Sequence, residues 1–195
     1  MSSTPISICA SRAKSSSKPI AGLGPTPSKT GFTVPLLKNA KIIEDPYTRV
    51  EGDEPLPDQG AVLVELARWQ TDRDTLIARD ADVGVQLTSA DPPGAIADDL
   101  LHLSLVALEF PAFTDGRAYS YARLLRERHG YPGEIRAVGD VLIEQLHFMH
   151  RAGFDSFEFS SDQPERDWTI AQSDMQVWYQ STGDKRPTAA QLRRR

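Results

Sequence analysis

Blocks of apolar residues alternate along the chain with blocks that have helical spacing. Short apolar runs, which are typical of buried strands, occupy residues 36–43, 61–66, 83–87, 103–110, 133–139 and 154–159. Helical spacing or helix-start signals predict helices at 71–82, 91–103, 115–129, 140–153 and 164–180. The segment 44–60 is rich in turn-forming residues and is predicted to be irregular. Strands and helices that alternate in this way predict right-handed βα units and a parallel sheet.

Two of the predicted helices have clear end signals. In 115–129 the apolar residues recur at the spacing of one helix face, and Gly130 follows as a stop. The helix 140–153 has Asp140 as a good N-cap, and Gly153 follows its last turn. We therefore expect a βα boundary close to residue 140.

The predicted fold class is α/β with a mainly parallel sheet of βα units. Such a sheet is either an open doubly wound sheet or half of a (β/α)₈ barrel, because a full barrel takes about 250 residues and this chain has 195. Residues 1–35, rich in Ser, Pro, Gly and Lys, are expected to form a disordered extension. A single domain is predicted over 36–182, and a polar basic tail over 183–195.

Composition and charge exclude several classes of function. The net charge is −5, which gives no global basic field to hold nucleic acid or an anionic membrane surface. No apolar stretch approaches the length of a membrane span, and the N-terminus lacks the apolar region of a secretory signal. The single cysteine, Cys9, excludes a disulfide framework or a thiolate metal site within this chain. We expect a cytoplasmic protein.

The residues that follow the predicted strands carry the candidate chemistry. Function in parallel sheets lies at the carboxyl ends of the strands. Asp115 and Arg117 lie at one such end, where a helix N-terminus and an arginine fork favour an anion, and Tyr119 and Ser120 add hydroxyl groups. The alternative is that Thr114 or Asp115 only caps the helix and that Arg117 pairs with a neighbouring carboxylate.

An arginine also lies inside the predicted strand 133–139. Arg136 must find a carboxylate or an anionic ligand there, because an unpaired buried charge is very costly. Asp115 and Asp140 are the candidate partners, since each lies at the carboxyl end of one of two successive strands. A structural salt bridge between two βα units explains Arg136 equally well.

Other familiar signals are weak or missing. The E-x-x-H motif of di-iron proteins occurs once, at Glu144 and His147 with His150 three residues further on. Such a site needs a second copy on another helix, so we expect no metal site. The sequence has no dinucleotide fingerprint, no phosphate-binding loop and no nucleophile elbow. We expect no cofactor.

Three segments resemble one family of bacterial proteins: FPAFTDGRAYS (110–120), ARLLRERHGYPGEIRAVGDVLIEQL (122–146) and RAGFDSFEF (151–159). The family is a domain of unknown function, often encoded beside sulfite reductase and labelled a probable oxidoreductase involved in sulfite reduction. Weaker resemblance reaches back through 41–48 and 62–69. It implies a role in sulfate assimilation, with sulfite reductase as a possible partner.

Three functions are compatible with these observations. In the first, the protein binds a small oxyanion and acts on it: Arg117 and Arg136 hold the anion, Asp115 or Asp140 orients an arginine or moves a proton, and Tyr119 and Ser120 donate hydrogen bonds. In the second, it is a non-catalytic accessory that docks on sulfite reductase. Contacts would then come from the two tails and from the aromatic residues Trp168, Trp178 and Tyr179. In the third, the Asp–Gly–Arg corner is purely architectural.

Overall fold

The computed structural model describes residues 34–182 and 186–193. The predicted N-terminal extension, up to residue 33, and Cys9 lie outside these residues, as do parts of the predicted basic tail. The strands are β1 (Leu36–Lys38), β2 (Lys41–Ile43), β3 (Tyr47–Val50), β4 (Ala61–Glu65), β5 (Val83–Leu87), β6 (Leu105–Phe110), β7 (Glu134–Gly139) and β8 (Ser156–Glu158). The helices are α1 (Leu66–Ile77), the 3₁₀ helix η1 (Pro93–His102), α2 (Arg117–Arg123), the π-helix turn η2 (Leu124–Arg128), α3 (Ile143–Ala152), α4 (Pro164–Asp174) and α5 (Ala189–Leu192).

The eight strands form one mostly parallel sheet in the order β2-β1-β8-β7-β6-β5-β4-β3. Strands β3 to β8 run parallel to their neighbours, whereas β1 is antiparallel to both β2 and β8. Helices separate the parallel strands from β4 to β8 along the chain, as the alternating pattern predicts, whereas β3 and β4 are joined by residues 51–60 without a helix. The predicted α/β class is therefore confirmed, and of the two alternatives the sheet is the half-barrel.

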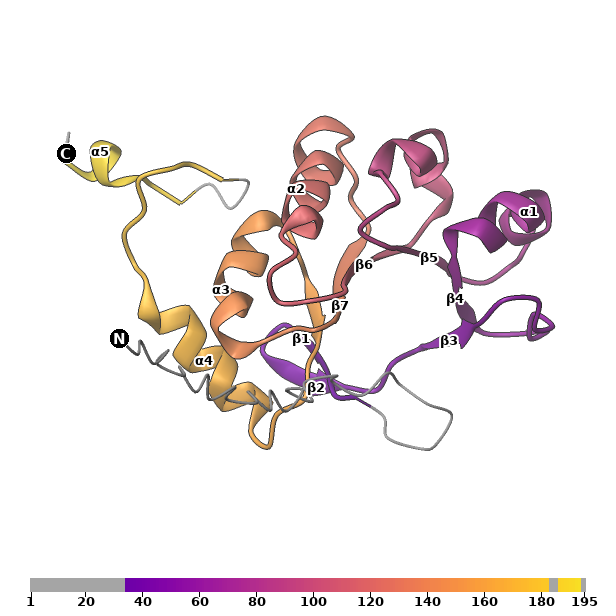
Figure 1. Ribbon diagram of the computed structural model, residues 1–195, viewed down its shortest axis with the longest axis horizontal. Helices are drawn as coiled ribbons and strands as arrows, with labels where there is room; N and C mark the ends of the chain where they lie inside the picture. Colours follow the sequence, from indigo (N-terminus) through magenta and orange to yellow (C-terminus); the bar gives the residue numbers. More distant parts are fainter. Residues whose placement is uncertain (1–33, 183–185, 194–195) are drawn as a thin grey trace, which may run out of the picture. The chain divides into compact units, whose positions relative to one another are not determined.

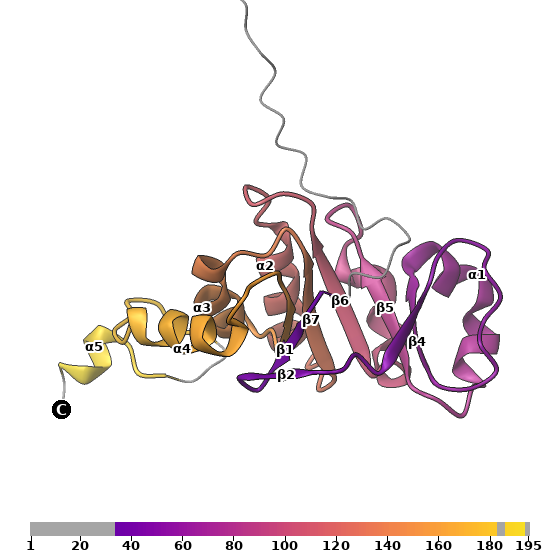
Figure 2. The same ribbon diagram turned by 90° about the horizontal axis from the view of Figure 1, so that it is seen from below.

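The connection between β2 and β3 requires the sheet to curl. These strands lie at opposite edges of the sheet, and eight flat strands would separate them by about 34 Å. Only residues 44–46 connect them, and a chain from Ile43 to Tyr47 spans at most about 14 Å. The edges are therefore drawn toward each other, and the linker crosses one face of the sheet (Figures 1 and 2).

The two faces of the curled sheet have different partners. Helices cover the convex face (Figure 1), where Val85, Val106 and Phe157 are buried with the apolar sides of the helices in the main core. The concave face holds a small apolar cluster of Leu63, Leu105, Ala107 and Val138, against which Tyr47 packs. The concave face also holds the buried Leu36, which is paired with Glu158, and several charged or polar positions.

Two differences from the sequence prediction concern the N-terminal strands. The predicted strand 36–43 is a hairpin, because Asn39 and Ala40 turn the chain with positive φ angles of 52° and 63°. The segment 44–60, predicted to be irregular, contains the edge strand β3. Its residues Tyr47 and Arg49 face the concave side, where polar contacts rather than an apolar pattern fix them.

The predicted helix boundaries also shift in several places. The helix predicted at 71–82 begins earlier and is α1, and the helix predicted at 164–180 stops at Asp174. The helix predicted at 115–129 is an α-helix only to Arg123 and continues as a π turn. The glycine stops are confirmed: Gly130 and Gly153 follow their helices with φ of +63° and +113°.

Candidate functional site

The loops at the carboxyl ends of β6 and β7 are joined by Asp140. Its carboxylate accepts a hydrogen bond from the Phe113 N–H at 2.8 Å, and its own N–H donates to the Phe110 carbonyl at 2.8 Å. The prediction that Asp140 caps a helix is wrong, because α3 begins three residues later and Gln145 accepts from the Leu142 N–H. Asp140 instead holds two strand ends together.

Gly139 makes this close approach of β6 and β7 possible. Its φ is +93°, and a Cβ atom there would lie 2.5 Å from the Phe110 carbonyl oxygen. Only glycine meets both requirements. The sequence motif GD at 139–140 is therefore a packing feature of this rim.

Asp115 and Arg117 form a bidentate ion pair before and at the start of α2. The guanidinium Nη2 lies 2.6 Å from Oδ2 of Asp115, and Nε lies 3.0 Å from Oδ1. Hydrogen bonds from the Arg117 side chain and backbone N–H, with a smaller one from Ser89, hold the pKa of Asp115 well below its usual range. Asp115 is thus a carboxylate anchor for Arg117, whose side chain is 57% exposed.

The two predicted hydroxyl donors lie in different surroundings. Tyr119 packs edge-on against Phe110, with ring centroids 5.2 Å apart, and also contacts Phe154. Burial raises the pKa of Tyr119 to about 12, so the phenol stays protonated at neutral pH. Ser120 is exposed on the outer side of α2. The Tyr119 side chain therefore packs at the edge of the hydrophobic core, whereas the Ser120 hydroxyl lies on the surface.

Arg136 lies on the concave face, away from both predicted partners. It is completely buried, and its guanidinium contacts Asp45 at 2.8 Å, Glu134 at 3.2 Å and Glu158 at 3.4 Å. The prediction that Asp115 or Asp140 pairs with Arg136 is wrong, because Arg136 points to the face that the 44–46 linker crosses. The predicted need for a carboxylate partner is confirmed.

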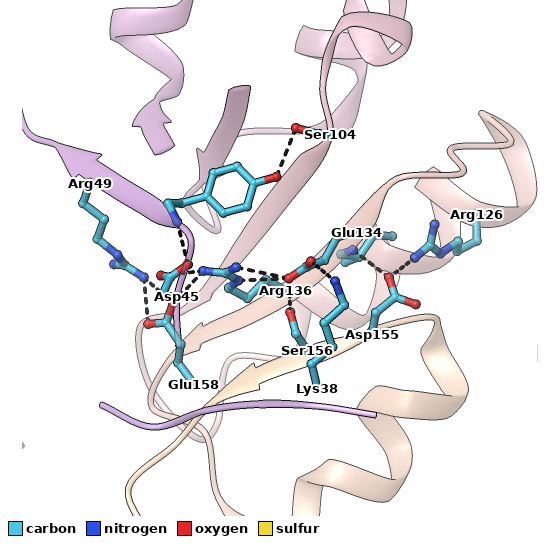
Figure 3. A network of polar contacts seen from close by, with 12 residues as sticks. Lys38, Asp45, Arg49, Ser104, Arg126, Glu134, Arg136, Asp155, Ser156 and Glu158 are labelled. Atoms are coloured by element: carbon cyan, nitrogen blue, oxygen red, sulfur yellow. Dashed lines mark hydrogen bonds and ion pairs between the residues drawn. The ribbon is translucent and has the colours of Figure 1, made fainter. Parts of the chain in front are cut away.

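Figure 3 shows that these contacts belong to one network that reaches across the concave face. Lys38 binds Glu134 at 2.5 Å, and Arg49 of β3 binds Glu158 of β8 at 2.7 Å. Ser156 donates to Glu134 at 2.5 Å, and the Arg136 guanidinium lies 5.4 Å from the centre of the Tyr47 ring. The edge strand β3 thus meets β8, which lies near the opposite edge of the sheet, through side chains.

The charges in this network balance. Lys38, Arg49 and Arg136 face the three carboxylates of Asp45, Glu134 and Glu158. Burial acts to raise the pKa of Glu134, but hydrogen bonds from Lys38 and Ser156 and the charge of Arg136 outweigh it and lower the pKa. Each buried charge therefore has a partner, which makes this network a means of closing the sheet.

The outer side of α2 and η2 carries an open cavity of about 410 Å³. It is lined by Ser120, Arg123, Leu124, Glu127 and Arg128. A second hollow of about 540 Å³ adjoins it through Arg123 and is lined otherwise by the C-terminal segment: Tyr179, Gln180, Ser181, Thr188 and Gln191. Of the predicted site residues, only Ser120 lines either cavity.

The C-terminal segment is held to α3 by Trp178. The indole is stacked on His147, with centroids 5.6 Å apart, and donates to its Nε2 at 3.1 Å. The Arg151 guanidinium lies 4.5 Å from the indole centre. His147 is thus buried in an aromatic contact. Within the described residues, no group of three or more metal-ligating side chains gathers.

Sequence reasoning missed most of the residues of the concave network. Asp45, Glu134 and Glu158 are charged positions beside apolar ones, which also suits solvated strand edges. The available signal was the lone arginine in a buried strand, which demands several acceptors. It could not identify them, because they come from strands far apart in the sequence.

A model of a bacterial protein family of unknown function (DUF934) matches residues 84–189. The matched region contains β5 to β8 and the helices from η1 to the start of α5. The search of curated proteins found no match. Within the described residues, none of the helices has the length and apolarity needed to cross a membrane.

Proposed function

The chain belongs to this bacterial family of unknown function, and from that premise we propose that it is a non-catalytic accessory protein of sulfite reduction that docks on sulfite reductase. The pathway comes from the family resemblance of residues 110–159. The docking role rests on the surface described next. In this proposal the protein works in sulfate assimilation in the cytoplasm.

Exposed apolar side chains in the C-terminal half carry the docking proposal. Fourteen large hydrophobic residues are exposed in the described part of the chain, and nine of them lie between residues 124 and 192. The nine are Leu124, Leu142, Ile143, Phe148, Ile170, Met175, Val177, Tyr179 and Leu192. Contiguous exposed apolar surface is typical of a site that binds another macromolecule, and the docking proposal takes these residues of η2, α3, α4 and the C-terminal segment as its source.

The scatter of the predicted catalytic residues also favours docking over catalysis. A reaction needs its acid, base and binding groups within hydrogen-bond reach of one substrate position. Arg136 is sealed in the concave network, and the Tyr119 ring is packed against Phe110 and Phe154. No hydrogen bond or ion pair within the described residues joins Asp140 or Arg136 to Arg117.

Co-purification with sulfite reductase tests this proposal. The tagged protein and the reductase encoded beside it are expressed together, and the complex is analysed by size-exclusion chromatography and by sulfite-reduction rate. We expect a stable complex and a reductase whose activity or lifetime changes when the accessory is removed. Separate elution together with an unchanged rate would refute the docking role.

Growth of a deletion strain tests the pathway itself. If the protein serves sulfite reduction, the strain grows on sulfide and fails on both sulfate and sulfite. Rescue by sulfite would place the protein upstream of this step, and unimpaired growth on sulfate would remove it from the pathway.

The exposed guanidinium of Arg117 favours one second candidate, the binding of a small oxyanion such as sulfite. Asp115 orients it at the carboxyl end of β6, where anions bind in many parallel sheets. In this variant of the function, Asp115, Arg117 and Asp140 serve catalysis, and Ser120 or Tyr119 assists binding. Calorimetry with sulfite tests it: binding must occur with the unaltered protein and vanish with Arg117→Ala, and no heat with the unaltered protein refutes it.

A further inference from the structure

Two open hollows share Arg123 in their lining, and we call them together the arginine groove. One wall is the outer side of α2 and η2, with Ser120, Leu124 and Arg128. The other is the segment after α4, with Tyr179, Gln180 and Ser181, followed by Thr188 and Gln191. This groove lies outside the candidate residues at the carboxyl ends of the strands, except for Ser120.

The π turn brings two arginines of this groove together. In η2 the His129 N–H donates to the Leu124 carbonyl at 3.0 Å, five residues back. Such a turn holds more residues than the 3.6 of an α-helix, so residues five apart lie nearer to one side of the helix. Arg123 and Arg128 consequently line the same cavity. π turns often occur at functional sites.

The two arginines of the arginine groove can form ion pairs with a partner. Among the residues that the structure describes, Arg123 pairs only with Glu127, at 3.1 Å, and both side chains are nearly half exposed. Arg128 is exposed, and no hydrogen bond or ion pair joins it to another described residue. Exposed pairs of this kind contribute little to stability, so Arg123 can leave Glu127 and pair with a carboxylate of a partner at little cost in free energy. On a chain of net charge −5, such a site favours an acidic partner.

Apolar groups lie beside these charges. Leu124 is 38% exposed between the two arginines, and Tyr179 is 84% exposed on the opposite wall. Tyrosine and arginine, with tryptophan, are enriched among the residues that dominate binding energy in interfaces. Both hollows are open to solvent, whereas small ligands bind mostly in enclosed pockets.

We propose that the arginine groove binds an acidic peptide segment of a partner protein that also carries an apolar side chain. Arg123 and Arg128 would pair with carboxylates of the segment, and its apolar side chain would lie between Leu124 and Tyr179. This inference rests on the proposed docking function and names the part of the surface that recognises the partner.

Fluorescence anisotropy of the full chain tests the proposal. The probe is a short fluorescein-labelled peptide in which glutamate alternates with leucine, and the comparison peptides replace glutamate by lysine or leucine by serine. We expect the glutamate–leucine peptide to bind best and its affinity to fall as salt is added. The double variant Arg123→Glu, Arg128→Glu should weaken binding about tenfold or more.

Two further variants keep this test independent of folding. Tyr179→Ser alters a side chain that is 84% exposed and should also weaken binding. The matched control is Arg166→Glu, which alters an exposed arginine of α4 that donates a hydrogen bond to Gln163, and this variant should bind as the unaltered protein does. Equal affinity of the unaltered protein and the double variant, or preference for the lysine peptide, would overturn the proposal. So would saturation of the groove by inorganic sulfate when the peptide does not bind.

Failure of the groove and failure of the docking function can be told apart. If sulfite reductase binds the unaltered protein and the double variant equally, docking stands and the arginine groove is not its site. If the peptide binds through both arginines but the reductase does not bind at all, the groove stands and sulfite reductase is the wrong partner.

Discussion

Arg136 keeps its charge inside the protein because three carboxylates surround it. The sequence indicates the requirement, since an arginine in a buried strand needs acceptors. It does not indicate the partners, because Asp45 reaches Arg136 through the curl of the sheet and Glu158 comes from the next strand. The residue that was proposed as an anion ligand is best explained as a structural one.

Replacement of Arg136 by methionine tests that explanation. The variant leaves Asp45, Glu134 and Glu158 close together without their shared cation, so the free energy of unfolding should fall by about 3–5 kcal/mol. Urea denaturation measures it. The control Arg166→Met, at an exposed position of α4, should change it by less than about 0.5 kcal/mol. A loss below about 1 kcal/mol for Arg136→Met would contradict the structural role.

The titration of Glu134 gives a second residue-level prediction. Its pKa is lowered in the folded protein from an ordinary value of 4.5, so its ion pairs stabilise the fold fully above about pH 4.5. That contribution is lost as pH falls through the lower folded pKa. The difference in unfolding free energy between the unaltered protein and Glu134→Gln should therefore be largest near neutral pH and shrink in acid. A difference that does not vary with pH would contradict it.

At the scale of elements, Arg126 explains why the helix after β6 widens into a π turn. Its guanidinium donates to the carbonyls of Gly153, Tyr131 and Gly133 and pairs with Asp155. These contacts fix η2 against the loops before β7 and β8. Helical periodicity predicts the helix and Gly130 its end, but the π turn depends on these tertiary contacts and leaves no mark in the spacing of apolar residues.

Loss of Arg126 should loosen this element selectively. Arg126→Met removes several hydrogen bonds from a charged donor and should cost about 2–4 kcal/mol of stability. The amides of His129 and Tyr131, which donate to Leu124 and Leu125, should exchange faster with deuterium. Arg123→Met loses only an exposed pair and serves as the control. Unchanged exchange at both amides would show that Arg126 does not hold the turn.

At the scale of the whole sheet, the local pattern of apolar residues predicts the strands and helices, and tertiary contacts decide how they are arranged. The apolar runs correctly indicate the parallel strands from β4 to β8, and the alternation gives the fold class. The hairpin at Asn39 and the edge strand β3 were not predicted, because polar contacts and chain connectivity define them. The candidate residues also separate, because Arg136 lies within β7 on the concave face, whereas the others lie at or after the carboxyl ends of β6 and β7.

Hydrogen–deuterium exchange of the complex with sulfite reductase tests the central claim, docking through the C-terminal half, most directly. The account predicts slower exchange in α2 and η2 (117–128) and in 175–182 when the reductase is added. Exchange in β3 and β4 should stay unchanged, and the variant Arg123→Glu, Arg128→Glu should lose the protection. Protection confined to 41–65, or no change in any peptide at saturating reductase, would contradict it.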